Sequence, residues 1–224
     1  MSKDTWIAVD QYLVGRMLPP DPALEAALKA SDAAGLPPIS VSATNGKLLH
    51  LLARIAGARR ILEIGTLGGY STIWMARALP ADGRLVTLEA DEKHAAVARA
   101  NIARAELDDL VEIRVGRALD TLPALEAEGR EPFDLIFIDA DKAGTPDYFR
   151  WSLRLSRPGT TIIVDNVIRD GAIIEDGSSD GSVQGMRRFF DLVAAEPRVS
   201  ATALQTVGFK GYDGFAIAVV NGPS

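Results

Sequence analysis

Short apolar runs alternate with amphipathic segments from about residue 58 onward. The runs of predicted strand length are Arg60–Ile64, Arg84–Leu88, Val111–Val115, Phe133–Ile138 and Thr160–Val164. The segments with helical spacing between them are Ser71–Leu79, Glu92–Ala105, Leu119–Glu128 and Tyr148–Leu155. Strands that alternate with helices in this way predict βαβ units, and therefore a parallel sheet that carries helices on both faces.

The last third of the chain changes rhythm. A helix is predicted near Val183–Ala195, followed by strands at Ala201–Val207 and Phe215–Val220. The intervening stretch Lys210–Gly214 contains two glycines and an aspartate, which is typical of the turn of an antiparallel hairpin. We therefore expect two antiparallel strands at one edge of the sheet.

The predicted fold is α/β: a Rossmann-like, doubly wound, mostly parallel sheet of seven strands with an antiparallel C-terminal edge hairpin. Residues 1–57 look helical and are interrupted by two Pro-Pro pairs, so they are expected to form a cap on an α/β core at 58–224. One domain over residues 1–224 is expected, because no break in composition separates two cores.

Composition narrows the classes of function. The formal charge of −6 and the isoelectric point near 5.0 argue against a nucleic-acid partner, which requires a basic surface. The chain has no cysteine, which excludes a disulfide scaffold, a thiolate metal site and a thiol nucleophile. The N-terminal stretch lacks the apolar run of a signal peptide, and no stretch reaches membrane-spanning length. We expect a cytoplasmic protein with no membrane partner.

A glycine turn follows the first predicted strand. Its spacing, Gly65 then Gly68-Gly69, is G-x-x-G-G and not the G-x-G-x-x-G of dinucleotide-binding proteins. The acidic Glu63 just before the turn would repel a phosphate but suits a cationic ligand, such as the ammonium and sulfonium of S-adenosylmethionine. Glu89 ends the second strand, where an acid grips a ribose diol in nucleoside-binding folds. Alternatively, both acids are merely solvated groups at strand ends.

Two further predicted strands end in side-chain oxygens. Asp139 follows one buried-type strand, and Asp165-Asn166 follow the next. Neighbouring strands lie about 4.8 Å apart, so these side chains can converge on one ion. Two carboxylates and an amide form a hard oxygen ligand set that favours Mg²⁺, Mn²⁺ or Ca²⁺ over zinc or copper.

These motifs together resemble the cation-dependent class I S-adenosylmethionine O-methyltransferases, the family of catechol O-methyltransferase, its caffeoyl-coenzyme A O-methyltransferase branch and bacterial relatives. The segments that carry the resemblance are Glu63-Ile64-Gly65-Thr66, Gly69-Tyr70-Ser71, Ile138-Asp139-Ala140-Asp141-Lys142 and Val164-Asp165-Asn166-Val167. The resemblance covers nearly the whole chain, from about Ile39 to Val220.

The resemblance implies roles for particular residues. The implied metal ligands are Asp139, Asp165 and Asn166, and the implied general base is Lys142. The implied contacts to S-adenosylmethionine are Val41, Glu63, Gly65, Thr66, Ser71, Glu89, Ala118 and Asp139. The implied acceptor is a small aromatic molecule with a catechol-like or hydroxycinnamoyl-like hydroxyl, and a homodimer is expected.

Other interpretations of the sequence remain open. An NAD(P)-dependent oxidoreductase could use a similar fold, although the glycine spacing opposes it, and a non-catalytic S-adenosylmethionine-binding protein would keep the fold without the reaction. His50 and His94 occur in helical stretches and are expected to be structural or solvated. The cap and the polar loop 174–184 are expected to set acceptor specificity.

Overall fold

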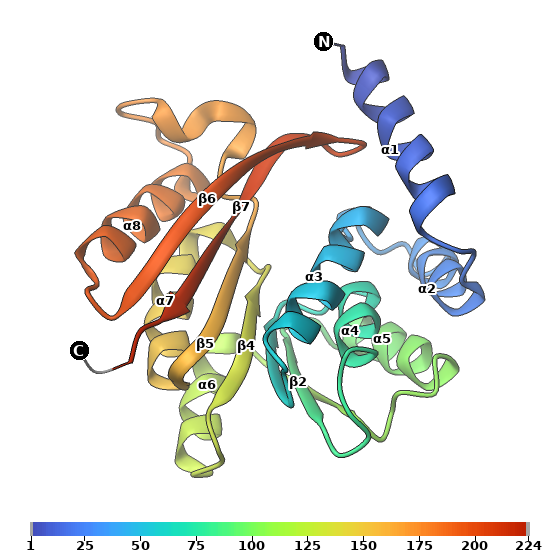
Figure 1. Ribbon diagram of the computed structural model, residues 1–224, viewed down its shortest axis with the longest axis horizontal. Coiled ribbons are helices and arrows are strands. Elements are labelled where there is room, and N and C mark those ends of the chain that lie inside the picture. The colour runs from blue at the N-terminus through green and yellow to red at the C-terminus, as the bar shows by residue number, and fades with distance from the viewer. Residues whose placement is uncertain (1, 223–224) are drawn as a thin grey trace.

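The computed structural model describes residues 2–222, and its centre is a seven-stranded sheet with strand order β3-β2-β1-β4-β5-β7-β6. The strands are β1 (Arg60–Ile64), β2 (Arg84–Glu89), β3 (Val111–Val115), β4 (Phe133–Ile138), β5 (Ser156–Asp165), β6 (Val199–Gly208) and β7 (Gly211–Val220). Strands β1 to β5 pair in parallel, and β7 pairs antiparallel with both β5 and β6 (Figure 1). The predicted doubly wound sheet with an edge hairpin is confirmed.

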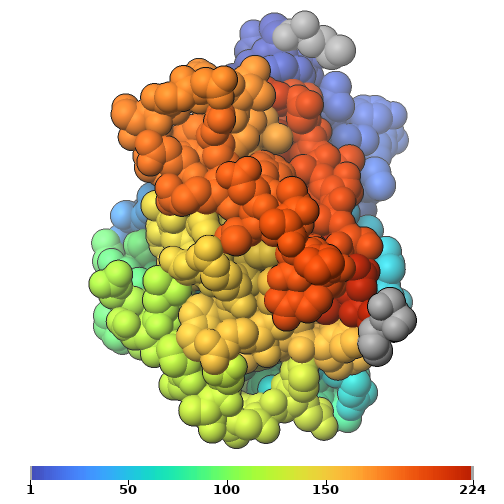
Figure 2. Space-filling view, turned by 90° about the vertical axis from the view of Figure 1, so that its left-hand side faces the viewer, coloured from blue at the N-terminus to red at the C-terminus, as the bar shows by residue number. Residues whose placement is uncertain are grey.

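Helices cover both faces of this sheet (Figure 1). The α-helices are α1 (Lys3–Met17), α2 (Pro22–Ala33), α3 (Ala43–Ile55), α4 (Tyr70–Ala76), α5 (Glu92–Arg104), α6 (Ala118–Ala127), α7 (Thr145–Arg154) and α8 (Gly181–Ala195); the 3₁₀ helices are η1 (Lys142–Gly144) and η2 (Arg169–Ile174). One buried cluster joins α3, α4 and α5 to the sheet, and a second joins α6, α7 and α8 to its other face. Seen from the α8 side, the orange and orange-red segments around α8 and β6 cover much of the surface (Figure 2).

Strand β4 lies at the centre of the sheet, and its sequence is apolar except for Asp134. All six of its residues, Phe133–Ile138, are buried. A parallel strand covered by helices on both faces cannot place a polar residue on either face without a partner. The polar exception, Asp134, accepts hydrogen bonds from the backbone N–H groups of Arg59 and Arg60 at 2.8 and 2.9 Å.

The predicted position of the hairpin turn is wrong. The turn is Phe209-Lys210, and Gly211–Gly214, assigned to the turn by the sequence pattern, belongs to β7. The ladder continues because Gly214 pairs with Gln205, and its missing side chain permits a close approach: a Cβ there would lie 2.1 Å from the carbonyl oxygen of Leu204. The glycine that suggested a turn thus serves close strand packing.

The parallel pairing sets one row of residues across the sheet. Ile64 of β1 pairs with Leu88 of β2 and Ile138 of β4, and Ile138 pairs with Val164 of β5. The next row along the chain direction therefore contains Glu89, Gly65, Asp139 and Asp165. Four separate sequence motifs meet along this one line at the carboxyl ends of the strands.

Within residues 2–222, no helix combines the length and the apolar character that crossing a membrane requires.

Candidate active site

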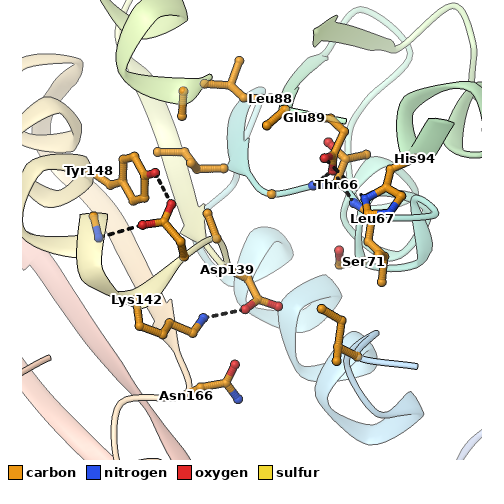
Figure 3. Close-up of a pocket in the computed structure, with 18 of the residues that line it drawn as sticks. Thr66, Leu67, Ser71, Leu88, Glu89, His94, Asp139, Lys142, Tyr148 and Asn166 are labelled. Carbon is orange, nitrogen blue, oxygen red and sulfur yellow. Dashed lines mark hydrogen bonds and ion pairs between the residues drawn. The ribbon is translucent and has the colours of Figure 1, made fainter. Parts of the chain in front are cut away.

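A cavity of about 760 Å³ lies at the carboxyl ends of the parallel strands. Its walls come from the loops that follow β1, β2, β3, β4 and β5, together with the segment Ile39–Val41 that leads into α3. Figure 3 shows side chains from these loops pointing toward a common space. Ligand sites in open parallel sheets occupy this edge, beyond the strand ends.

The glycine turn after β1 exists because two strand ends approach each other closely. Gly65 has a φ of +101°, and a Cβ at this position would lie 2.2 Å from the carbonyl oxygen of Asp139. The backbone N–H of Asp139 in turn donates to the carbonyl oxygen of Ile64 at 2.9 Å. Any side chain at position 65 would push the β1 and β4 loops apart, so glycine is required by packing as well as by conformation.

Glu89 connects the end of β2 to the glycine turn. Its Oε2 accepts hydrogen bonds from the backbone N–H groups of Thr66 and Leu67, at 3.1 and 2.7 Å. Its Oε1 accepts one from the backbone N–H of Asp91 at 3.0 Å. His94, in the first turn of α5, places Nδ1 3.6 Å from Oε1 and lines the cavity. His94, expected to be structural or solvated, therefore lies at the site, because the β2–α5 connection is short enough to bring the start of α5 back to the strand end.

His50 behaves as the sequence suggested. Its Nδ1 lies 3.1 Å from the carbonyl oxygen of Trp74, and its ring meets the Trp74 ring edge-on. The residue lies outside the lining of the main cavity and packs α3 against α4.

Glu63 lies beneath the cavity and does not line it. The side chain is fully buried, and its carboxylate accepts hydrogen bonds from the hydroxyls of Ser71, Thr72 and Thr87. Burial raises the pKa of Glu63 to about 7, although the three hydroxyl donors oppose the shift, and the negative charge of Asp139 adds to it. The carboxyl is therefore poised to take up or release a proton near neutral pH.

The predicted metal ligands form the second half of the site. Asp139 Oδ1 accepts from Lys142 Nζ at 2.7 Å, and the lysine side chain is only 9% exposed. Asp165 ends the neighbouring strand β5 in the same row as Asp139, and its Oδ1 accepts a hydrogen bond from the N–H of Asn166. Burial, with a contribution from the negative charge of Asp139, raises the pKa of Asp165 above its ordinary range. Among the described residues, no three His, Cys, Asp or Glu side chains form a metal-binding group, so the candidate set is two carboxylates plus an amide.

Backbone conformation directs Asn166 into the cavity. Its φ of +56° places it in the left-handed region, which asparagine tolerates better than most residues. Figure 3 shows its side-chain amide below the Asp139–Lys142 pair. By contrast, both oxygens of the nearby Asp141 are engaged, one by the Tyr148 hydroxyl and the other by the N–H of Gly144. Asp139 is therefore the carboxylate of this loop with capacity to bind a ligand.

Lys142 is supported from behind by α8. A Cβ added to Gly185 would lie 2.1 Å from the carbonyl oxygen of Lys142, so the helix backbone packs directly against η1. This contact fixes the loop from which the lysine points toward Asp139. Lys142, in the loop after β4, is thus positioned by α8, which lies about 40 residues later in the sequence.

The structure brings together most of the predicted site. The predicted residues that line the cavity are Val41, Gly65, Thr66, Ser71, Glu89, Ala118, Asp139, Lys142 and Asn166. Glu63 and Asp165 do not line it, and Asp165 borders a small apolar cavity between α3 and the sheet. None of residues 174–184 lines the main cavity.

Several residues that line the cavity were not among the predicted site residues, and two of them carry polar groups of interest. Tyr148 stands on α7 with its hydroxyl on Asp141, and Arg169 follows β5 with its Nε buried and without a hydrogen-bond partner. Arg169 has a φ of +55°, a conformation that nothing in its local sequence indicates.

Replacement of Glu63 by glutamine should change how stability depends on pH. In the folded state the pKa of Glu63 is about 7, whereas that of a glutamate in the unfolded chain is about 4.5. The wild-type protein should therefore lose stability as pH rises from 5 to 8, by roughly 3 kcal/mol from this group. Glu63→Gln removes the titrating group, so this loss should shrink by about that amount in urea unfolding at the two pH values.

The exposed carboxylate of Glu25, in the first turn of α2, provides the matched control. Glu25→Gln should keep the wild-type pH dependence. An equally steep loss of stability in Glu63→Gln would show that Glu63 carries its charge in the folded protein without penalty.

Comparison with known proteins agrees with this geometry. The O-methyltransferase family model matches residues 21–217. A catechol O-methyltransferase of Niastella koreensis is 55% identical over 220 residues, covering 98% of this chain and 100% of the relative. The crystal structure of an O-methyltransferase from Bacillus cereus in complex with S-adenosylhomocysteine has a TM-score of 0.97 and 62% identity, covering 98% of this chain and 100% of that chain.

A third relative was solved with the methyl donor itself. The O-methyltransferase TomG from Streptomyces achromogenes, involved in tomaymycin synthesis and crystallised with S-adenosylmethionine, has a TM-score of 0.96 and 52% identity over 99% of this chain and 100% of that chain. The fold, the site and these relatives agree. The chain belongs to the O-methyltransferase family and is an S-adenosylmethionine-dependent O-methyltransferase.

Proposed function

We propose that this enzyme uses a divalent metal to methylate a hydroxyl of a catechol-like or hydroxycinnamoyl-like aromatic acceptor. The observation that carries the proposal is the row of strand ends, which places Asp139 and Asp165 beside each other and next to the glycine turn. Relatives named catechol O-methyltransferase support the acceptor class. They give no support to an NAD(P)-dependent oxidoreductase or to a non-catalytic binding protein.

The side chains fit a hard divalent cation held by Asp139, Asp165 and Asn166. Two adjacent carboxylates, one of them half-buried with a raised pKa, carry negative charge that the ion pair between Lys142 and Asp139 offsets only in part. Oxygen donors of this kind favour Mg²⁺ or Mn²⁺, with Ca²⁺ as a further candidate. When bound, such a cation supplies Lewis acidity toward an aromatic hydroxyl and a template for two adjacent oxygens.

S-adenosylmethionine would occupy the half of the cavity around the glycine turn. Glu89 would face the ribose, Val41 and Ala118 would border the ligand, and the Gly65-Thr66 backbone would approach it closely. Glu63 would act through space from beneath the turn, because its charged form favours a cationic ligand above it. The proposed cofactor contacts are Val41, Glu63, Gly65, Thr66, Ser71, Glu89, Ala118 and Asp139.

Lys142 would act as the general base. Its Nζ, in the neutral form, would accept the proton of the acceptor hydroxyl, and the oxygen would then attack the methyl carbon of the sulfonium. The carbon–sulfur bond breaks as the carbon–oxygen bond forms, leaving the methyl ether and neutral S-adenosylhomocysteine. Because an anion joins a cation, the site contributes mainly alignment and exclusion of water.

Removal of metal should abolish the reaction. Methyl transfer to catechol should stop in EDTA and recover with Mg²⁺ or Mn²⁺, whereas full activity in the chelator would remove the metal from the mechanism. Asp165→Asn should lose metal-stimulated activity, yet its metal-free melting temperature should equal or exceed that of the wild type, because a carboxylate that burial disfavours becomes neutral. Asp147→Asn, on the exposed start of α7, is the control and should behave as wild type.

Two substitutions of Lys142 separate base catalysis from charge. Lys142→Met and Lys142→Arg should both lower kcat by about 10²- to 10⁴-fold, because arginine keeps the ion pair with Asp139 but does not accept a proton. Binding of S-adenosylhomocysteine, measured by calorimetry, should change only a few-fold. If the arginine variant retained wild-type kcat, the lysine would act through its charge and not as the base.

We also propose that the enzyme is a homodimer, with α1 at the contact. No residue of α1 is buried, and Val9, Tyr12 and Met17 are 51%, 64% and 70% exposed. Apolar side chains gathered on one helix are typical of an interaction surface. Light scattering should give twice the chain mass, and Tyr12→Glu with Met17→Glu should give a monomer. Ile55→Glu, on the exposed end of α3, should leave the dimer intact.

The cytoplasmic location and the division into a cap and a core stay predictions from the sequence.

A further inference from the structure

A second cavity of about 420 Å³ adjoins the site. It lies between α1, the segment 36–44 and the tip of the β6–β7 hairpin. Ser40, Val41 and Tyr70 line both cavities, so the two spaces meet at the entrance to α3. A cavity of this size holds a ring substituent or a short chain attached to a molecule in the main site.

One face of α1 forms the outer wall of this second cavity. Ile7, Asp10, Gln11 and Val14 line it and recur at the spacing of a single helix face. The helix is tied to the hairpin by Asp10, whose Oδ2 accepts from the N–H of Phe209 at 2.7 Å. Most of the remaining wall is apolar, and its further contributors include Leu28, Leu36, Pro37 and Pro38.

Lys210 at the hairpin tip brings a positive charge to this cavity. No side-chain hydrogen bond or ion pair of Lys210 exists within residues 2–222, and the side chain is accessible from solvent. The surrounding elements lower the pKa of Lys210 by desolvation; the charges of Asp139 and Asp165 oppose this shift and that of Lys142 adds to it. The ammonium therefore lies within electrostatic range of the proposed catalytic groups while standing on the wall of the second cavity.

Two carboxylates, those of Asp10 and Asp32, line the second cavity together with Lys210, and neither forms an ion pair with it. Asp10 accepts a hydrogen bond from the N–H of Phe209, and Asp32 lines the cavity from α2 but is exposed to solvent, which screens its charge. Asp139 and Asp165, the acids that Lys210 senses, are those assigned to a dication in the proposed function. When both carboxylates bind the dication, no carboxylate among residues 2–222 fully neutralises the charge of Lys142 or of Lys210.

We propose that Lys210 is a specificity-determining residue that pairs with a carboxylate on the acceptor's side chain, and that the second cavity holds that side chain. The inference rests on the proposed function, because it places the aromatic diol at Asp139 and Asn166. The preferred acceptor is then an aromatic diol with a short, flat arm that ends in a carboxylate. An ester of the same arm has the same shape without the charge, so it isolates the contribution of Lys210.

The test compares caffeate, methyl caffeate and catechol as acceptors in steady-state kinetics. The wild type should prefer caffeate over its ester by about tenfold in kcat/KM, as expected for one charge-assisted contact. Lys210→Met should remove this preference through the KM for caffeate, with the ester and catechol unchanged within twofold, and Lys210→Arg should restore it. Lys29→Met, on the exposed side of α2, controls for net charge and should match the wild type.

Binding without turnover provides an independent readout. Calorimetric titration of caffeate in the presence of metal and S-adenosylhomocysteine should show the same tenfold loss in Lys210→Met. Val14→Trp should weaken caffeate and methyl caffeate alike but spare catechol, because it fills the second cavity alone.

The outcomes separate the two proposals. Absence of methyl transfer to every acceptor would overturn the proposed function, while the titration would still decide whether Lys210 binds the carboxylate. Equal binding of caffeate by the wild type and Lys210→Met, or an equal loss for all three acceptors, would overturn the role of Lys210.

Discussion

The alignment of the carboxyl ends of β2, β1, β4 and β5 is the constraint on which the rest of the molecule depends. Their register places Glu89, Gly65, Asp139 and Asp165 in one row. Backbone hydrogen bonds extend this row beyond the strands, from Gly65 to the carbonyl of Leu88 and from Asp139 to that of Ile64. A slip of one residue in β4 would turn the Asp139 side chain to the opposite face. The buried apolar sides of these strands prevent such a slip, so the core positions the chemistry.

This alignment concentrates the negative charges of several carboxylates where water is largely excluded. Neighbouring hydrogen-bond donors and cations offset these charges to different degrees. Glu63 receives three hydroxyl hydrogen bonds and still has a pKa of about 7, while Asp139 has a single lysine. A fold selected only for stability would replace such carboxylates with neutral side chains. Under the proposed function, cationic ligands explain their presence: a sulfonium above Glu63, and a dication beside Asp139 and Asp165.

The sequence predicted those parts of the site that depend on local pattern. Strand ends follow from apolar runs, and the acids and glycines after them were therefore assigned correctly to one edge. It failed where a residue's role depends on distant segments. The sequence pattern assigned Gly214 to a turn, but in the structure its lack of a side chain allows close packing against the backbone of Leu204. His94 read as a solvated helical residue, because nothing local shows that the start of α5 returns to Glu89.

The two halves of the proposed acceptor site also differ in whether they depend on the central sheet or on contacts between distant segments. The reacting groups stand on loops fixed by the central sheet, and their geometry changes only if the core changes. The second cavity is built from α1 and the hairpin tip, segments about 200 residues apart that meet through the Asp10–Phe209 contact. Since no residue of α1 is buried, substitutions there alter the shape and charge of the cavity with little effect on the core. Acceptor preference can therefore change in this part of the molecule while the methyl-transfer geometry is retained, and Lys210 lies where the two parts meet.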